Sequence, residues 1–236
     1  MRKLLYVPII HLGSDLGSAA SALDQRGASL CGEERWDRHK ETVAKFWDGI
    51  ANYFATVDAS NLKIYQDGLP ADGELGKKII EEGVKRGSKN YQIILELMVR
   101  GAMIIKTEDP ALLQEEYENI TGITRAESAP EKSDAYVNYK TRRNKLTKER
   151  DKFVAKKINE TLKEGETGVL FMGSYHDIHT YLPQDIVLEQ VKEREKVNAY
   201  FKELISGKNE KRFKQLAEYL ILPYITLCIL RTSTNC

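Results

Sequence analysis

The fold of this chain is decided by one stretch, Gly168-Val169-Leu170-Phe171-Met172-Gly173-Ser174-Tyr175-His176-Asp177. Its apolar run, residues 169–172, shows no polar alternation. That is typical of a parallel strand covered on both faces, although a buried helix segment would show the same pattern. Gly173 lets the backbone turn sharply after the strand. Ligands bind beyond the carboxyl ends of parallel strands, so His176 and Asp177 are candidate site residues, unless His176 only caps the turn.

Outward from this stretch, strands alternate with helices. Strand-like apolar runs occupy residues 4–10, 62–65 and 102–105, and helical spacing occupies 34–57, 73–86, 89–100, 111–119 and 135–162. Residues 184–205 and 209–222 are predicted to be mostly helical. The alternation predicts an α/β fold in a single domain, residues 1–236, with a mostly parallel central sheet flanked by helices and a helical C-terminal portion. His39 lies off the apolar stripe of its helix and is expected to be solvated.

Charge and cysteine content narrow the classes of partner. The chain of 236 residues has a formal net charge of +1, so bulk charge signals neither nucleic acid nor a membrane surface. No apolar run is long enough to span a bilayer. Three widely spaced cysteines without a CxxC pair indicate a reducing, cytoplasmic environment. The sequence is compatible with an assembly of several copies of the chain.

Polar side chains follow all four expected strands. They are His11 after the first strand, Asp67 after the second, Glu108 after the third, and His176 with Asp177 after the fourth. If the strands are parallel, these groups converge at one edge of the sheet. Imidazoles and carboxylates there could hold a divalent metal ion such as manganese, cobalt or zinc, or could activate water by general base catalysis. Strand ends are also simply where a chain becomes polar.

Arg150 is the most informative charge in the basic helix at 135–162. Leu146, Val154 and Ile158 define the apolar stripe of this helix, and Arg150 falls within that stripe. A guanidinium that points inward needs a carboxylate or another anion as its partner. The rest of the charge run is expected to form a solvated face.

Two short motifs resemble a known superfamily. Glu149-Arg150-Asp151 lies in a helix that leads into the buried strand, and Gly173-Ser174-Tyr175-His176 follows that strand. This order resembles the C-terminal signature of the TraB/TIKI, ChaN and erythromycin-esterase superfamily, in which a helix with Glu-Arg-Asn/Asp precedes a strand and a Gly-x-x-His motif. An earlier Gly-x-x-His of that superfamily corresponds here to Pro8-Ile9-Ile10-His11, with proline in place of glycine.

The resemblance implies an α/β fold in which the two histidine motifs face one cleft. It also implies hydrolase activity, with metal-dependent proteolysis in one branch, esterase action in another and haem binding in ChaN-like members. The leading hypothesis is therefore a hydrolase, with metal assistance left open, that acts on an ester, an amide or a peptide. The expected roles are metal ligand or base for His11 and His176, ligand or orienting acid for Asp67 and Glu108, binder of a substrate carboxylate or oxyanion for Arg150, and imidazole-orienting acid for Asp177.

Two other classes of function remain open. The first is a non-catalytic module that binds an anionic small molecule at the glycine-rich turn of residues 13–17, with Arg150 as the counter-charge, or that binds a haem-like ligand. The second is an interaction protein whose basic helix, residues 135–162, docks a partner. Loss of turnover on replacing His11 or His176 would favour the hydrolase, whereas retention of a ligand without turnover would favour the binding module.

Overall fold

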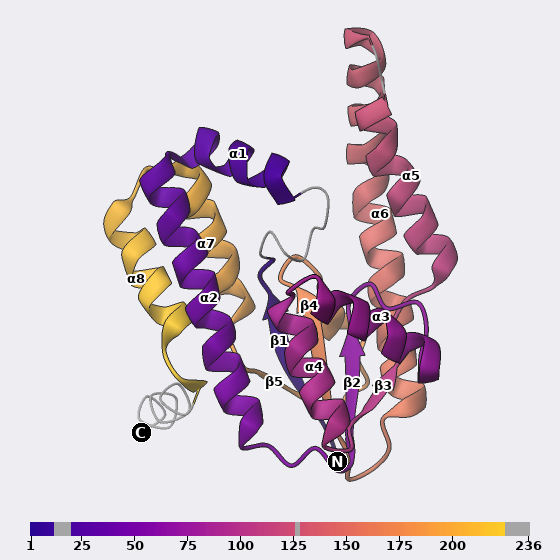
Figure 1. Cartoon of the computed structure of the whole chain (residues 1–236). Helices are drawn as coiled ribbons and strands as arrows, with labels where there is room; N and C mark the ends of the chain where they lie inside the picture. Colours follow the sequence, from indigo (N-terminus) through magenta and orange to yellow (C-terminus); the bar gives the residue numbers. More distant parts are fainter. Residues whose placement is uncertain (12–19, 126–127, 225–236) are drawn as a thin grey trace.

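A computed structural model describes residues 1–11, 20–125 and 128–224. Its centre is a sheet of five parallel strands in the order β3-β2-β4-β1-β5. The strands are β1 (Arg2–Ile9), β2 (Leu62–Gln66), β3 (Met103–Ile105), β4 (Thr167–Gly173) and β5 (Ile186–Gln190). The predicted α/β fold with a mostly parallel sheet is confirmed, and helices cover both faces of the sheet (Figure 1).

The apolar run that defines the fold is the central strand β4. Residues 169–172 are completely buried. β4 pairs with β1 on one side and with β2 on the other. Val169 and Phe171 contact one hydrophobic cluster, whereas Leu170 and Met172 contact a second cluster on the opposite face. A central strand that is buried on both faces needs apolar side chains at every position, and residues 169–172 of β4 supply them.

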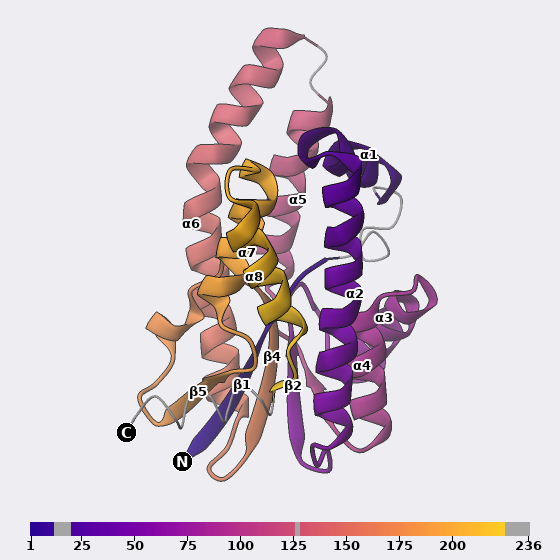
Figure 2. The ribbon, with the colours of Figure 1, turned by 90° about the vertical axis from the view of Figure 1, so that its left-hand side faces the viewer.

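The helices divide unequally between the two faces. The larger cluster joins the sheet to α2 (Glu33–Ala55), α3 (Gly73–Lys85), α4 (Lys89–Val99), α7 (Arg194–Ser206) and α8 (Glu210–Ile221). α1 (Ala20–Cys31) lies beside α2 and α7. The smaller cluster lies under α6 (Ala129–Thr161) and the short 3-10 helix η2 (Ile178–Tyr181). Figure 2 shows these two layers on either side of the strands.

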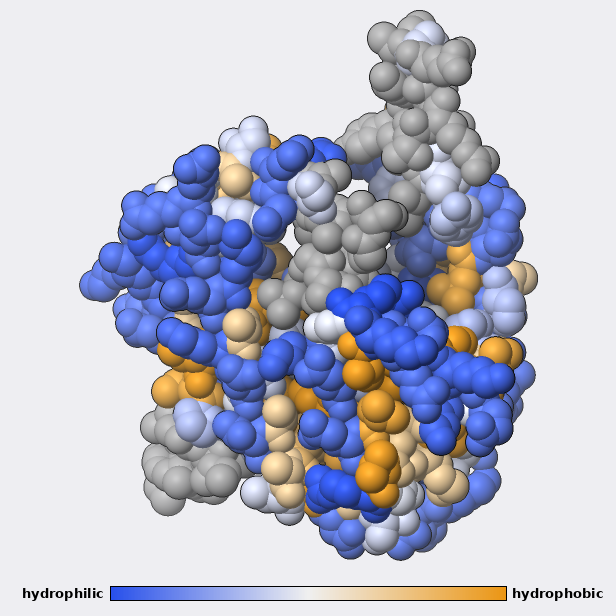
Figure 3. All heavy atoms as spheres, viewed as in Figure 1, coloured by the Kyte–Doolittle hydropathy of each residue, from blue (hydrophilic) through white to orange (hydrophobic). Residues whose placement is uncertain are grey.

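α5 (Pro110–Arg125) packs against α6 to form a helical pair. The pair extends beyond the rest of the molecule on the side where the strands end (Figure 1). On the face shown in Figure 3, hydrophilic residues cover most of α2 and α3, and hydrophobic residues show mainly in strips between the helices. No helix within residues 1–11, 20–125 or 128–224 combines the length and hydrophobicity that a membrane crossing requires.

The edge strand β5 corrects the prediction that residues 184–205 are mostly helical. Ile186–Gln190 pairs with β1, and the helix α7 begins only at Arg194. Leu188, Glu189 and Gln190 are good helix formers, so local propensity favoured a helix. Pairing with β1 outweighs that propensity, because tertiary context commonly overrides weak local preferences.

His39 is buried rather than solvated, which is a second correction. Only 4% of this residue is exposed, and its Nδ1 lies 3.0 Å from the Tyr200 hydroxyl. Its ring also contacts Trp36 and Phe201. α2 therefore buries a second face against α7 in addition to the face on the sheet. Burial lowers the pKa of His39 to about 4, because desolvation disfavours the imidazolium.

The buried imidazole predicts a loss of stability in acid. The pKa of His39 lies near 4 in the folded state, whereas an unfolded histidine titrates near ~6.5. The contribution of His39 to the free energy of unfolding is therefore fully present above pH ~6.5 and is lost as the pH falls towards 4. Between pH ~7.5 and ~4.5, the free energy of unfolding should fall by ~2.5 kcal/mol more in the wild type than in His39→Gln. Urea unfolding of both proteins at the two pH values measures this difference. Equal losses would show that His39 is not buried in its neutral form.

Candidate active site

The candidate site lies where β1, β2 and β4 end. Ile9 is level with Gly173 in the sheet register, and Gln66 is level with Phe171. The residues that follow these strands therefore emerge at one edge, as the parallel arrangement predicts. They border a cleft of about 230 Å³ whose lining includes His11, Asp67, Asn90, Glu116, Arg150 and Tyr175.

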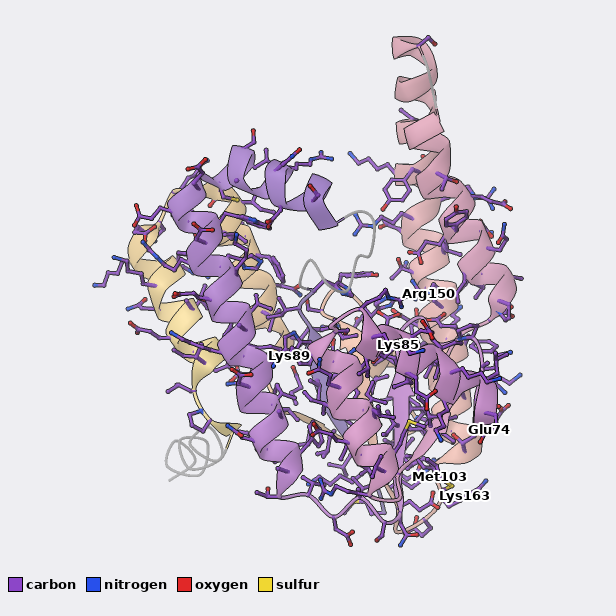
Figure 4. All side chains as sticks on the ribbon, in the orientation of Figure 1. Glu74, Lys85, Lys89, Met103, Arg150 and Lys163 are labelled. Atoms are coloured by element: carbon purple, nitrogen blue, oxygen red, sulfur yellow. The ribbon has the colours of Figure 1, made fainter. Side chains whose placement is uncertain are left out.

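Arg150 is the centre of a buried ion-pair network. Its Nε and Nη2 donate to the two carboxylate oxygens of Glu108 at 3.1 and 2.6 Å. Nη2 also donates to Asp67 Oδ1 at 2.6 Å, and Nη1 donates to Glu116 Oε2 at 2.7 Å. Figure 4 places Arg150 at the edge where the strands end. Only 3% of Arg150 is exposed, so the predicted inward orientation is confirmed.

The partners of Arg150 correct its predicted role. It was expected to bind a carboxylate or an oxyanion of the substrate. Instead, its donors bond to three carboxylates of the protein itself, those of Asp67, Glu108 and Glu116. Charged partners in such a dry environment form strong hydrogen bonds, so the guanidinium holds the carboxylates in place. Arg150 thus orders the site and is not a free anion receptor.

The network also sets the ionisation of Asp67. Burial by itself would raise the pKa of this carboxyl. The positive charges of the imidazolium form of His176 and of the Arg150 guanidinium outweigh burial, and the Gly173 N–H, which donates to Asp67 Oδ2 at 3.2 Å, adds to their effect. Together they hold the pKa of Asp67 below its ordinary value. Asp67 is therefore a fixed negative charge in the lining of the cleft.

His176 is held by a carboxylate from α6. The residue is completely buried, and its Nδ1 is hydrogen-bonded to Asp151. The other oxygen of Asp151 accepts the backbone N–H of Asp177 at 2.9 Å. The second ring nitrogen, Nε2, has no hydrogen-bond partner among the described residues, and it lies 3.7 Å from Asp67 Oδ2. A buried imidazole fixed at one nitrogen and unsatisfied at the other is typical of a functional histidine.

Asp177 does not orient the imidazole, contrary to the prediction from its place beside His176 in the sequence. Its carboxylate is 55% exposed and pairs with Arg194 at 2.9 Å. The carboxylate that reaches the ring comes instead from Asp151. The turn after β4 directs the side chains of His176 and Asp177 to different neighbours, whereas α6 presents Asp151 to the sheet beside Arg150.

Tyr175 covers the imidazole. The Tyr175 ring lies on that of His176, with 4.3 Å between the ring centroids, and Tyr175 itself lines the cleft. Gly173 permits this arrangement, because a Cβ at that position would lie 2.8 Å from a Tyr175 ring carbon. Burial raises the pKa of the Tyr175 hydroxyl to about 12, so this side chain is neutral at ordinary pH.

The predicted metal ligands do not form a metal centre in the described chain. His11 lines the same cleft as Asp67, whereas His176 lines a separate cavity of about 190 Å³ and reaches the cleft only through its Nε2, 3.7 Å from Asp67 Oδ2. However, both carboxylate oxygens of Glu108 and the Oδ1 atom of Asp67 already accept hydrogen bonds from the guanidinium of Arg150. Within the parts of the chain that the structure describes, no three His, Cys, Asp or Glu side chains converge as potential ligands. The alternative anion site, the turn at residues 13–17, lies outside the described residues.

Several site residues were not found from the sequence. Asp151 follows Arg150 and lies on the same face of α6 as Val154 and Ile158, so the spacing that revealed Arg150 could have revealed it too. Glu116, Asn90 and Tyr175 carry no comparable local signal. They reach the site only because α5, α4 and the turn after β4 pack around it.

Comparison of the chain with protein-family models, with curated proteins and with solved structures gave no significant match. The assignment of a function therefore rests on the geometry of the site and on the motifs in the sequence.

Proposed function

We propose that this protein is a hydrolase in which His176, held by Asp151, activates water for attack on an ester or amide carbonyl. The observation that carries the proposal is the state of the imidazole. Nδ1 is bonded to a buried carboxylate, and Nε2 is buried without a hydrogen-bond partner among the described residues. A carboxylate on one nitrogen of an imidazole fixes its tautomer and orientation, which leaves the other nitrogen to accept a proton.

The reaction uses groups that are already in place. The substrate water would donate one hydrogen to Nε2, and Asp67 Oδ2, 3.7 Å from Nε2, can accept its other hydrogen. As the water oxygen bonds to the carbonyl carbon, the π electrons of the C=O bond move onto the carbonyl oxygen and the water proton passes to Nε2; the C=O bond re-forms when the leaving group departs. The imidazolium formed is stabilised by Asp151 and Asp67, and it returns the proton to the leaving alkoxide or amine as the bond to carbon breaks. Water is consumed, and an acid and an alcohol or amine are released.

Tyr175 would control access to the imidazole. The His176 side chain is completely buried, whereas Tyr175 is 51% exposed and lies against the His176 ring. Displacement of the Tyr175 ring would open Nε2 to a substrate in the cleft. A closed ring would keep the acid–base pair away from bulk water, which strengthens its electrostatic interactions.

The spatial arrangement of the motif residues supports a relation to the TraB/TIKI, ChaN and erythromycin-esterase superfamily. Arg150 and Asp151 come from the helix motif, and Gly173 and His176 come from the strand motif. Arg150, Gly173 and His176 each contact Asp67, and Asp151 holds the ring of His176. We propose this relation on the motifs and on their meeting in space. The proposed reaction is written without a metal ion, because the described ligand candidates do not fit one.

The proposal is tested by assaying the purified protein against a panel of 4-nitrophenyl esters and peptide amides. His176→Gln should lower kcat/KM by about 10²–10⁴-fold, which is the usual contribution of a general base. His179→Gln is the matched control, because His179 is exposed on η2. It should keep nearly full activity. Equal activity of the wild type and His176→Gln on every substrate that is turned over, or no turnover of any substrate, would contradict the proposal.

A further inference from the structure

A second unsatisfied polar atom belongs to Asn90, in the lining of the same cleft. Asn90 is the second residue of α4 and is only 3% exposed. Its Oδ1 is buried and has no hydrogen-bond partner among the described residues. Buried polar atoms are nearly always satisfied, so such an atom in the lining of a cleft needs a partner from outside the chain, a water molecule or a ligand.

The orientation of the Asn90 amide follows from its neighbours. The backbone carbonyl of Asp67 can only accept a hydrogen bond, so the Gln66 side chain must present its NH₂ group there, at 3.0 Å. Gln66 Oε1 then faces Asn90 and must receive a donor, which is Asn90 Nδ2 at 2.8 Å. This chain of bonds leaves Oδ1, a pure acceptor, as the unpaired atom of Asn90. A flipped amide would place two acceptors or two donors against each other.

The charges around Asn90 have the sign that complements a hydrogen-bond donor. Asp67 and Glu116 contribute carboxylates to the lining, and Glu116 is partly exposed. Arg150 also belongs to the described lining, but its guanidinium already donates to the carboxylates of Asp67, Glu108 and Glu116. An anionic ligand would meet acceptors and negative charge here. A cation with several N–H groups would meet partners.

We propose that the cleft binds a primary ammonium group of the substrate, with Asn90 Oδ1 and the carboxylates of Asp67 and Glu116 as its acceptors. An ammonium offers three donors, which matches these three acceptors. The cleft, at about 230 Å³, is smaller than the ~300–1,000 Å³ that holds a drug-sized ligand, so it suits a short aminoalkyl arm. The inference rests on the proposed function, and it narrows the substrate to esters or amides that carry such an arm near the scissile bond.

Binding is tested separately from turnover. Butylammonium, butanol and butyrate are titrated into the full chain at pH 7 and followed by NMR chemical shifts. Butylammonium should bind at least about tenfold more tightly than the other two, which is the effect of one satisfied charged hydrogen bond. Glu116→Gln should reduce this preference at least about fivefold. Glu115→Gln is the matched control, because Glu115 is the preceding residue of α5 and pairs with Arg142. It should leave the preference unchanged.

Asn90→Leu provides a second test of the same site, with circular dichroism to confirm that each variant is folded. It should also weaken butylammonium binding. Equal affinity of the wild type for butylammonium and butanol would overturn the inference. So would a preference that survives in both Glu116→Gln and Asn90→Leu.

Turnover distinguishes failure of this inference from failure of the proposed function. Three 4-nitrophenyl esters of matched length end in an ammonium, a methyl or a carboxylate group. We expect the highest kcat/KM for the ammonium ester. Equal kcat/KM for all three would overturn the inference and leave the hydrolase intact. Selective binding of butylammonium without hydrolysis of any ester would overturn the hydrolase and leave the ligand class intact.

Discussion

Arg150→Met should lower the free energy of unfolding by about 3–5 kcal/mol, the usual cost of removing one partner of a buried ion pair. Methionine retains most of the apolar volume, so the loss reports the charge and the hydrogen bonds. Without the guanidinium, Asp67 and Glu108 are left as buried carboxylates without their cation. Urea unfolding at pH 7, followed by circular dichroism, measures the change.

Arg142→Met is the control for this variant. Both arginines lie on α6, and each pairs with a glutamate of α5: Arg142 with Glu115 and Arg150 with Glu116. The Arg142 side chain is 59% exposed, so its replacement should cost less than about 1 kcal/mol. The deficit of Arg150→Met should also shrink as the pH falls, because burial raises the pKa of Glu108 and protonation removes its uncompensated charge. Equal losses in the two variants would show that the network does not stabilise the fold.

Asp151→Asn should reduce kcat/KM by about 10³–10⁴-fold with little effect on folding, as is typical when the carboxylate of an acid–histidine pair is replaced by an amide. The backbone N–H of Asp177 donates to Asp151 Oδ2 and would keep the oxygen of the new amide in that position. The amide NH₂ group would then face His176 Nδ1. That contact forces the ring proton onto Nε2, which can no longer accept a proton from water.

Asp177→Asn is the matched comparison, because it makes the same chemical change beside the same histidine. Its carboxylate pairs with Arg194 and does not reach the imidazole, so kcat/KM should change less than about threefold, within the small effect of an exposed ion pair. Steady-state kinetics on any ester hydrolysed by the wild type measures both variants. A larger loss in Asp177→Asn than in Asp151→Asn would reverse the assignment.

The two carboxylates that lie beside the His176 ring come from different parts of the fold and have different roles. Asp151 stands on α6 and fixes the tautomer of His176. Asp67 follows β2, is held by Arg150, and faces the other nitrogen of the ring. The imidazole thus lies between an orienting carboxylate and one that can share the substrate water. The stability and the proposed chemistry of this site therefore depend on the same arginine.

Local sequence patterns determined the architecture. The uninterrupted run at 169–172 indicated a central buried strand, and alternation of strands with helices indicated a parallel sheet. The apolar spacing of α6 placed Arg150 on the buried face. These inferences succeeded because hydrophobic periodicity records which side of an element meets the core, and that is a property of neighbouring residues.

Tertiary structure alone decided the partners of each polar group. Asp177 adjoins His176 in the sequence, yet Asp151, 25 residues earlier, makes the contact. Likewise, residues 186–190 form the strand β5 because they pair with the edge of β1. His39 is buried because α7 covers a second face of α2. The pairing of a side chain depends on how helices are rotated and packed against the sheet. A one-dimensional pattern shows that Arg150 needs an anion, but only the packed fold decides that Asp67, Glu108 and Glu116 supply it.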